Sequence, residues 1–525
     1  RSTQSRSSAA SDVYKRQVPG AWLDLDGYAQ TLGELSGGGA SGGNIALGGA
    51  TLTVGSGIYN GVISRSGGLT KTGAGTLTLG GSNSFSGTTT ISGGTLRLGV
   101  ANGLPSGGNL SLANAASAVF DLNGYAQTLG ELSGGGAAGG NITLGSGTLT
   151  VGSGSYNGSI AGEGSFVKTG TGTLELGGTN RYSGGTTIHG GTLRLRSAQA
   201  LPENSAVTLA NEPGATLDLN GHSVTIGVLS GGGASGGAVQ LSGATLTVKS
   251  GLFHGGITGS GSLEKVGEDT TLTLVGSSQI TGNVVVSGGK LQIGQGGMSG
   301  SLDADIVNNG VLEFNRSDNV EFNRSISGTG KVEKRGLGTL LLGGSATYQG
   351  GTEVWSGTLL VNTTLEGGGE VRVRGLGSEG PATLGGTGRI NGRVNVEQKA
   401  VLAPGRSIST LEVAGDVELA GVLHAELSGA LSDRLNVEGA LRLMPDSELR
   451  IEQLRPPTSP VYILASYGSL EGTFGEVTGM PDGYWLDYQY NGQNQIALIP
   501  EPATGLLGTL ALTLWRRRRR TPALR

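Results

Sequence analysis

The sequence predicts an all-β protein, an elongated right-handed parallel β-helix (solenoid), and three observations favour it. Gly supplies 104 of the 525 residues, almost three times its usual share of about 7%. Short segments such as T-L-T-L alternate apolar with polar residues between Gly, Asn or Ser, which is typical of strands with one buried face. A long sequence unit also recurs. Helices are disfavoured because each Gly inside one would cost about 1 kcal/mol.

The recurring unit is 97 residues long. Three ungapped copies begin at Trp22, Val119 and Thr216, and they define units at about 22–118, 119–215 and 216–300. Coils of roughly 20 to 25 residues would place about four in each unit. After residue 300 the long period is lost while the short strands continue, so we expect one solenoid over 18–455.

Composition and charge exclude several classes of protein. With no Cys, disulfides and thiolate metal sites are excluded. Hydrophobic residues make up 36% and the net charge is only −4, which argues against disorder. Without the four bases and one acid of 1–17 and the six arginines of 503–525, 25 bases and 38 acids remain. Such an acidic body disfavours nucleic acid as a partner.

The two ends of the chain differ from the repeats. Residues 1–17 carry no apolar core of a signal peptide, so we interpret them as an artefactual or disordered start with the secretion signal missing. Residues 456–499 are rich in aromatic residues and are expected to cap the stack. Within them, Tyr488 to Tyr490, then Asn491-Gly492, then residues up to Ile496, predict a β-hairpin.

A second module recurs in each unit. Its pattern is K-x-G-x-G-x-L-x-L-x-G, then N-x-(Y/F)-x-G-x-T, then G-G-T-L-x-(L/V). The first copy fills it with Lys71, Gly73, Gly75, Leu77, Leu79, Asn83, Phe85, Gly87, Gly93, Gly94 and Leu96. Further copies lie at 164–197, 261–295 and 330–362; the third has Glu268 in place of a core Gly and Ile280 at the aromatic position. The module resembles the autotransporter-associated β-strand repeat, and the resemblance implies a passenger-like β-helix.

Residues 500–525 combine three features. They contain Pro500, Glu501 and Pro502, an apolar stretch at 503–515, and the basic run Arg516, Arg517, Arg518, Arg519 and Arg520. The segment resembles a PEP-CTERM sorting signal, and the resemblance implies export and processing by an exosortase-type protease. The apolar stretch is shorter than the roughly 20 residues that span a bilayer, so we expect transient membrane contact.

Candidate functional residues are few, and each has a structural interpretation. Gly375 to Gly380 matches the spacing of a dinucleotide fingerprint but lacks its strand-turn-helix context. The SGGGASGG-type loops at Ser36, Ser133 and Ser230 are expected to be protruding flexible turns, with anion-binding nests as the alternative.

Polar residues at turns and strands complete the candidates. His189, His222, His254 and His424 are expected at solvated strand positions. The aligned residues Asp26, Asn123 and Asn220 predict a turn or a stacked polar ladder. Asp433 is expected at a corner, with a calcium ligand as the alternative. We therefore expect no catalytic residue, no cofactor and no metal site.

The sequence predicts a non-catalytic protein at the surface of a Gram-negative-type bacterium. Rows of Thr, Ser and Asn on flat coil faces would make weak multivalent contacts with extracellular polysaccharide or neighbouring cells. Two alternatives remain. A polysaccharide lyase or hydrolase would need clustered carboxylates, and a self-assembling surface-layer or matrix component would associate with itself.

Overall fold

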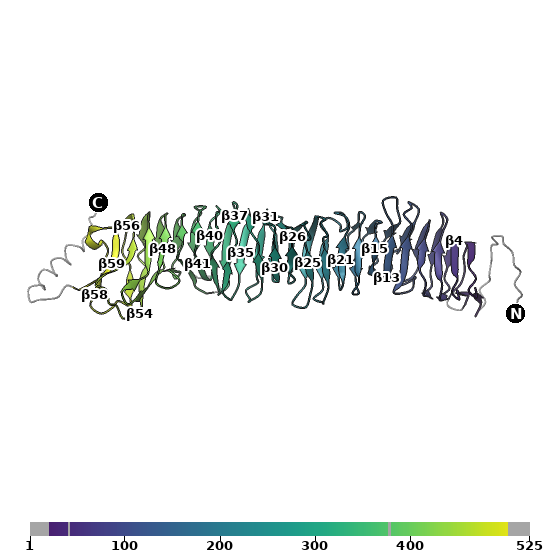
Figure 1. The fold of residues 1–525 in the computed structure, drawn as a ribbon, viewed down its shortest axis with the longest axis horizontal. Helices are drawn as coiled ribbons and strands as arrows, with labels where there is room; N and C mark the ends of the chain where they lie inside the picture. Colours follow the sequence, from purple (N-terminus) through teal and green to yellow (C-terminus); the bar gives the residue numbers. More distant parts are fainter. Residues whose placement is uncertain (1–19, 40–41, 376–379, 502–525) are drawn as a thin grey trace, which may run out of the picture. The chain divides into compact units, whose positions relative to one another are not determined.

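The computed structural model describes residues 20–39, 42–375 and 380–501, and it confirms the all-β parallel solenoid. The described chain forms two compact units. Unit 1 comprises residues 20–316 and 324–331, and unit 2 comprises 317–323 and 332–501. In each unit, successive coils place one strand beside the equivalent strand of the next coil, as the stacked arrows of Figure 1 show.

The coils of unit 1 have three sides, which we name faces 1, 2 and 3. Face 1 is formed by β2 (Gln30–Glu34), β4 (Thr51–Tyr59), β6 (Gly68–Lys71), β9 (Thr89–Ile91), β11 (Gly108–Leu112), β13 (Gln127–Gly134), β15 (Leu149–Tyr156), β18 (Thr173–Leu176), β21 (Thr192–Leu195), β23 (Thr216–Asp218), β25 (Ala238–Gln240), β27 (Ile257–Gly259), β30 (Ser277–Ile280) and β33 (Ser301–Asp303).

Face 2 begins with β1 (Trp22–Asp24), β3 (Asn44–Ala46), β5 (Ile63–Arg65) and β8 (Ser84–Phe85). It continues with the first halves of β13 and β15, then β17 (Phe166–Lys168), β20 (Thr186–Ile188), β22 (Ala206–Leu209), the second halves of β24 (Val224–Gly231) and β26 (Thr245–Phe253), β29 (Thr271–Leu274), β32 (Lys290–Ile293) and β35 (Val311–Asn315).

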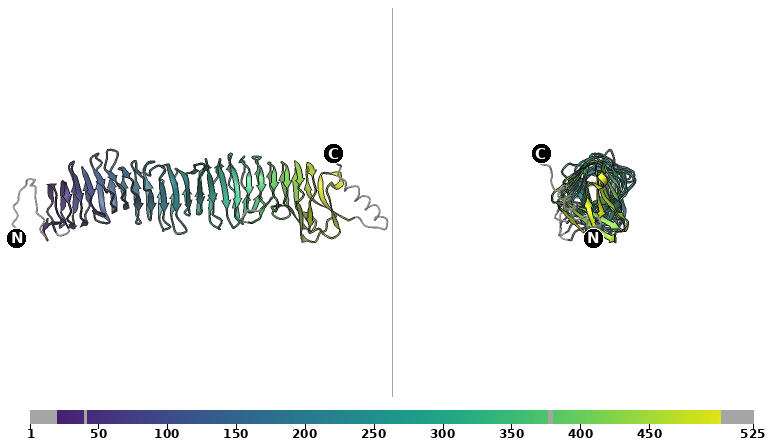
Figure 2. Two further views of the ribbon diagram at one scale, coloured as in Figure 1. Left: turned by 180° about the vertical axis from the view of Figure 1, so that it is seen from behind. Right: turned by 90° about the vertical axis from the view of Figure 1, so that its left-hand side faces the viewer.

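Face 3 begins with the second half of β4, then β7 (Thr76–Leu79), β10 (Thr95–Leu98), β12 (Val119–Asp121), β14 (Asn141–Thr143), β16 (Ile160–Gly162) and β19 (Arg181–Tyr182). It continues with the first halves of β24 and β26, then β28 (Ser262–Lys265), β31 (Val284–Val286), β34 (Ile306–Asn308) and β37 (Ile326–Ser327). The right-hand view in Figure 2 looks along the axis on which these coils are stacked.

Equivalent strands of the three copies lie on different faces. Strands β6, β17 and β28 are equivalent, yet they lie on faces 1, 2 and 3 respectively. The coils of unit 1 are 17 to 24 residues long, as the pairs Thr53↔Thr70, Thr70↔Thr90 and Thr95↔Val119 show, and the ladder from Thr70 to Glu175 passes through five coils. A 97-residue unit therefore spans about four and two-thirds coils rather than four. Each copy consequently turns the same surface by one face.

Unit 2 also has three parallel ladders. The first contains β36 (Val320–Phe322), β39 (Thr339–Leu342), β41 (Gly357–Val361), β44 (Ala382–Gly386), β47 (Val401–Pro404), β50 (Val422–Ser428), β54 (Glu448–Arg455) and β57 (Glu476–Thr478), and β51 (Leu431–Ser432) pairs antiparallel with β50. The second contains β38 (Lys331–Arg335), β40 (Thr352–Val354), β43 (Val371–Val373), β46 (Val394–Val396), β49 (Val417–Leu419), β53 (Ala440–Leu443) and β56 (Ser469–Glu471). The third contains β42 (Thr364–Leu365), β45 (Arg389–Ile390), β48 (Thr410–Val413), β52 (Arg434–Val437), β55 (Tyr462–Ser466), β59 (Gln495–Pro500) and β58 (Tyr484–Asp487).

The aromatic segment forms a hairpin, but not with the strands predicted. Strand β59 pairs antiparallel with both β58 and β55, which interrupts the parallel pattern. The paired strands end at Asp487 and resume at Gln495, so the predicted strand Tyr488–Tyr490 belongs to the connection. Asn491 and Gly492 do adopt positive φ angles of 54° and 71°, which the Asn-Gly signal predicts, but they lie in a short 3-10 turn inside a longer loop.

Alternation along each strand builds the core. Most Leu, Val and Ile side chains of the strands point inward and are almost fully buried, whereas the residues between them point outward. Burial of each such side chain contributes roughly 1.5 to 3 kcal/mol. Within the described ranges, no helix has the length and apolar character needed to cross a membrane.

Candidate interaction surface

Each copy of the repeated module buries one lysine inside the solenoid. Lys71, Lys168, Lys265 and Lys334 are at most 1% exposed. Each lies two residues after an inward apolar residue, as Lys71 follows Leu69, and strand alternation therefore directs its side chain inward. A buried ammonium must be compensated by hydrogen bonds.

Backbone carbonyl oxygens surround each ammonium, and we call this arrangement the lysine cage. Lys168 Nζ donates to the carbonyl oxygens of Thr169 (2.7 Å), Gly170 (3.3 Å) and Gly190 (2.9 Å). The first two lie on its own turn and the third lies one coil further on, so the cage joins two coils.

The other three lysines are held in the same way. The acceptors are the carbonyl oxygens of Thr72, Gly73 and Gly93 for Lys71, of Val266, Gly267 and Gly288 for Lys265, and of Arg335, Gly336 and Ser356 for Lys334. Desolvation by burial lowers the pKa of Lys168 to about 8 and lowers the pKa of Lys71 and Lys265.

The second Gly of the G-G-T-L segment leaves room for the cage. A Cβ on Gly191 would lie 2.7 Å from Lys168 Nζ and 2.3 Å from the carbonyl oxygen of Gly172, and φ is +62°. Gly94 has the same relation to Lys71, with its Cβ 2.4 Å from Nζ. The repeat pattern thus encodes the cage, whose ammonium faces protein atoms and not solvent.

The third copy keeps its cage despite departing from the pattern. One extra residue lies between Lys265 and its following strand, and the hydroxyl of Thr270 becomes a further acceptor at 3.0 Å. Ile280 is 3% exposed and takes the buried place of Phe85 and Tyr182.

The outer side of the first copy presents an uncharged row of hydroxyls, which we call the first hydroxyl row. Thr53 pairs with Thr70, and Thr70 pairs with Thr90, on successive coils of face 1. The whole row is Thr31, Thr53, Thr70, Thr90, Ser111 and Ser133. Successive positions are about 4.8 Å apart, so the row is about 24 Å long.

The hydroxyls of this row are available to a ligand. No side-chain hydrogen bond joins any of the six to another described residue. Beside the first four hydroxyls the outward positions carry no charge: they are Gly33, Thr51, Gly55, Gly68, Thr72, Thr88 and Ser92. At the far end of the row, Glu131 is exposed two residues before Ser133, and the next position, Ser155, contacts Glu175, so face 1 becomes charged there.

The second and third copies carry the equivalent rows on faces 2 and 3. The second hydroxyl row is Thr128, Thr150, Val167, Thr187, Thr208 and Ser230. Its last two hydroxyls bond to each other at 2.9 Å. In the third row, Glu264 and Val285 replace hydroxyls, and Glu264 accepts a hydrogen bond from Thr247.

The Gly-rich loops that follow Ser133 and Ser230 close as tight hairpins. Gly136 and Gly139 exchange two backbone hydrogen bonds, and Gly233 and Gly236 do the same. Asn114 Oδ1 accepts a hydrogen bond from the amide of Ala138 at the tip. This amide, which an anion-binding nest would use, therefore already has a partner.

The turn prediction for the aligned Asx positions is confirmed. Asp26, Asn123 and Asn220 have φ angles of 49°, 53° and 49°, in the left-handed region that Asn and Asp tolerate. The side-chain amide of Asn123 also donates to Leu98 O, one coil away.

The histidine prediction is correct for one residue only. His424 lies in strand β50, where its Nε2 is 3.1 Å from Glu452 Oε2. His189 and His254 are exposed and follow strand ends, and His222 lies in a turn. The polar-outward pattern predicts exposure but does not locate the end of a strand.

Asp433 lies between β51 and β52 and is 3% exposed. Its carboxylate accepts hydrogen bonds from the amides of Ser409 (2.9 Å) and Glu426 (3.0 Å). Burial raises its pKa to about 7. The described ranges contain no group of three or more His, Cys, Asp or Glu placed to hold a metal ion.

Two further predictions fall largely outside the described residues. The inner part of the Gly375–Gly380 segment, 376–379, is not described. Of the predicted sorting residues, Pro500 ends β59 and the amide of Glu501 donates to Gly483 O at 2.8 Å. Pro502 and the run Arg516 to Arg520 lie outside the described residues.

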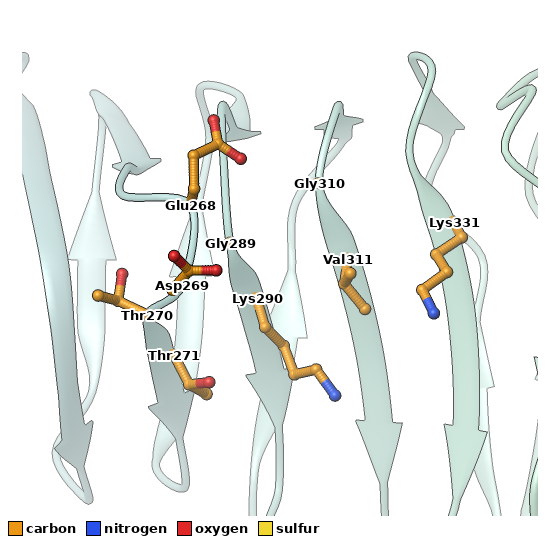
Figure 3. A pocket seen from close by; sticks show the side chains of 9 residues that line it. All are labelled: Glu268, Asp269, Thr270, Thr271, Gly289, Lys290, Gly310, Val311 and Lys331. Atoms are coloured by element: carbon orange, nitrogen blue, oxygen red, sulfur yellow. The ribbon is translucent and has the colours of Figure 1, made fainter.

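A cavity of about 480 Å³ opens on unit 1 where the third copy has its extra residue. Glu268 and Asp269 lie on the loop before β29, and Lys290 on β32 and Lys331 on β38 lie on either side of β35, as Figure 3 shows. Lys290 pairs with Glu313. The cavity is therefore lined by charges of both signs, and it lies at the copy that departs from the repeat pattern.

Comparison with known proteins assigns the modules that contain the lysine cages. Four segments match the passenger-associated-transport-repeat family. They are residues 69–98, 166–195, 263–293 and 332–361, and each contains one caged lysine. The segments lie within the four modules that the sequence pattern delimits. Each passenger-associated transport repeat is thus a set of short strands closed by one cage.

Three curated proteins are similar to parts of the chain. The Adhesin BmaC autotransporter of Brucella suis biovar 1 is 38% identical over 209 residues, which cover 36% of this chain and 6% of that protein. The Uncharacterized lipoprotein YdeK of Escherichia coli K12 is 30% identical over 269 residues, covering 50% of this chain and 17% of that protein. The Uncharacterized protein YuaQ, also of Escherichia coli K12, is 25% identical over 248 residues, covering 35% and 18%. The matches thus span less than a fifth of each of these relatives.

Proposed function

We propose that this chain belongs to a non-catalytic adhesive protein displayed on the bacterial surface, and that its hydroxyl rows bind extracellular polysaccharide. The observation that carries the proposal is the first hydroxyl row, whose six hydroxyls are in register and have no partner among the described residues. The passenger-associated transport repeats and the similarity to an autotransporter adhesin support surface display.

The chemistry of the row favours an uncharged polysaccharide. Each hydroxyl both donates and accepts a hydrogen bond, as sugar hydroxyls do. The rise of one sugar in an extended chain is close to the spacing of about 4.8 Å between coils, so one chain can contact several coils. Weak contacts then add through multivalency. The acidic excess of residues 18–502 disfavours polyanionic polymers.

The proposal also includes the route by which the chain reaches the cell surface. The PEP-CTERM-like segment would be processed at Pro500-Glu501-Pro502, where β59, the last strand of unit 2, ends, by an exosortase-type protease. Mass spectrometry of the mature C-terminus tests this step. Recovery from culture medium of a chain that ends in the intact run Arg516 to Arg520 contradicts it.

Retention on an immobilised uncharged β-glucan tests the binding. In the variant Thr53→Val/Thr70→Val/Thr90→Val, Val keeps the β-branched shape and removes only the hydroxyls. We expect about tenfold weaker retention of this variant, because contacts along one polymer multiply. No retention of the unmodified chain at any ionic strength would refute the proposal, and new reducing ends would indicate an enzyme instead.

Two matched variants control for changes in folding and for general stickiness. Thr225→Val removes an equivalent hydroxyl from the third row, which Glu264 and Val285 already interrupt, so we expect retention to be unchanged. Val167→Thr completes the second row, and we expect retention to increase.

A further inference from the structure

The repeat length rotates the binding surface from one copy to the next. The 97-residue period equals about four and two-thirds coils, so the equivalent strands β6 and β17 lie on faces 1 and 2 of unit 1. A period of a whole number of coils would have placed all copies on one face, where their hydroxyls would form a single line.

We propose that unit 1 holds two separate polysaccharide chains, one on the first hydroxyl row and one on the second, and so cross-links them. This inference rests on the proposed binding function and adds its geometry. The first row lies on face 1 and the second on face 2, so one straight polymer cannot lie along both. Two polymers can bind at once.

The residues of both rows suit this arrangement. Three threonine hydroxyls on each face form no hydrogen bond to another described residue. They belong to Thr53, Thr70 and Thr90 on face 1 and to Thr128, Thr150 and Thr187 on face 2. All six are outward-facing and lie on parallel strands in register.

The rows are also offset along the stack. The first extends from β2 to β13, and the second extends from β13 to β24. They share only the coils around β13, so a polymer on one face leaves most of the other row uncovered. The third row contributes less to binding, because the hydroxyl of Thr247 already donates a hydrogen bond to Glu264.

Faces 1 and 2 meet at a corner in the coil that both rows share. In β13, Gln127–Leu129 belong to face 2 and Glu131–Gly134 belong to face 1, so the strand turns the corner at Gly130. At the other end of the second row, the hairpin at Gly233 and Gly236 leads from β24 on face 2 to β25 on face 1. A straight polymer on one row therefore has no flat path onto the other row.

The test measures retention and cross-linking separately, using the full chain. One variant is Thr53→Val/Thr70→Val/Thr90→Val on face 1, another is Thr128→Val/Thr150→Val/Thr187→Val on face 2, and a third combines all six changes. Retention is measured on an immobilised uncharged β-glucan, and cross-linking is measured as the rise in light scattering when the chain is mixed with the same glucan in solution.

We expect the unmodified chain to be retained and to raise the scattering. Each single-face variant should still be retained, although more weakly than the unmodified chain, and should raise the scattering at least about fivefold less, because one row holds one polymer. The six-fold variant should do neither. Circular dichroism and thermal unfolding of each variant should match the unmodified chain, since the changes are on the outer surface.

Two results would overturn the inference while leaving the binding function in place. In one, the face 1 variant loses all retention, so only one row binds. In the other, either single-face variant scatters as strongly as the unmodified chain. Scattering by the protein without glucan would instead assign the effect to self-association and would also overturn it. If the unmodified chain is not retained at all, the proposed function itself fails.

Discussion

The inner and outer sides of the repeats differ in how closely the four modules agree. Inside, all four place a lysine in a cage of carbonyl oxygens. Outside, the residue just before each of these lysines is Thr70, Val167, Glu264 or Glu333. The repeat pattern therefore specifies how coils are joined, whereas each copy sets its own surface chemistry. A match to this repeat family alone consequently identifies a scaffold and not a ligand.

Removal of a caged ammonium should have the largest effect on stability. Lys168→Met keeps much of the side-chain volume but leaves the carbonyl oxygens of Thr169, Gly170 and Gly190 without their donor. Each unsatisfied buried acceptor costs about 1 to 3 kcal/mol, so we expect a loss of about 5 kcal/mol. Hydrogen exchange of amides in 166–195 measures it locally, which suits a repeat array whose coils need not unfold together.

Lys249→Met is the matched control for this change. Lys249 lies on β26 with its side chain exposed, and surface substitutions usually change stability by less than about 0.5 kcal/mol. Equal effects of the two substitutions would mean that the cage adds nothing to the joining of coils.

The space around the cage gives the second prediction. In Gly191→Ala, the new Cβ lies 2.3 Å from Gly172 O and 2.7 Å from Lys168 Nζ, so the neighbouring coil must shift. The positive φ alone costs about 1 to 2 kcal/mol. We expect a total loss of about 3 kcal/mol in the same hydrogen-exchange measurement.

Gly214→Ala separates the two causes. Gly214 has a φ of +81° but no atom within 4 Å of the added Cβ, so this variant carries the backbone strain without the collision. A loss in Gly191→Ala no larger than in Gly214→Ala would contradict the steric role of Gly191.

The strands and the repeat were predictable from the sequence because both depend on local patterns. Alternation places Leu and Val inside, and the period aligns the copies. The buried lysines were missed, since Lys is normally read as exposed, although the even spacing from Leu69 to Lys71 was a signal of an inward side chain. The rotation of copies was missed because it depends on coil lengths that vary from 17 to 24 residues, which composition does not fix.

The cap shows another limit of local signals. Asn491-Gly492 correctly marked a reversal with positive φ angles, but the pairing of β59 with β55 as well as β58 sets where the strands begin. Tertiary pairing therefore moved the strand ends by several residues. The same limit applies to His189 and His254, which are exposed as predicted but follow the ends of β20 and β26 instead of lying within a strand.

The smallest of the three expected effects on stability comes from Asp433, a buried carboxyl group in unit 2 that contrasts with the caged lysines. The pKa of Asp433 is raised to about 7 from 3.8, mainly by burial. Between these values the folded chain binds a proton that the unfolded chain does not, so the free energy of unfolding falls as pH rises. From pH 5 to pH 8 this site should remove about 2.5 kcal/mol.

The variant Asp433→Asn isolates that change because it lacks the titrating group. Asp416, Glu438 and Glu448, whose pKa values are lowered, titrate alike in both chains and cancel in the difference. We expect the stability of the unmodified chain relative to the variant, from urea unfolding followed by circular dichroism, to decrease from pH 5 to pH 8. A constant difference would mean that the amides of Ser409 and Glu426 stabilise the carboxylate as fully as water does. Backbone amides would then compensate a buried anion here, as backbone carbonyl oxygens compensate a buried cation in the lysine cage.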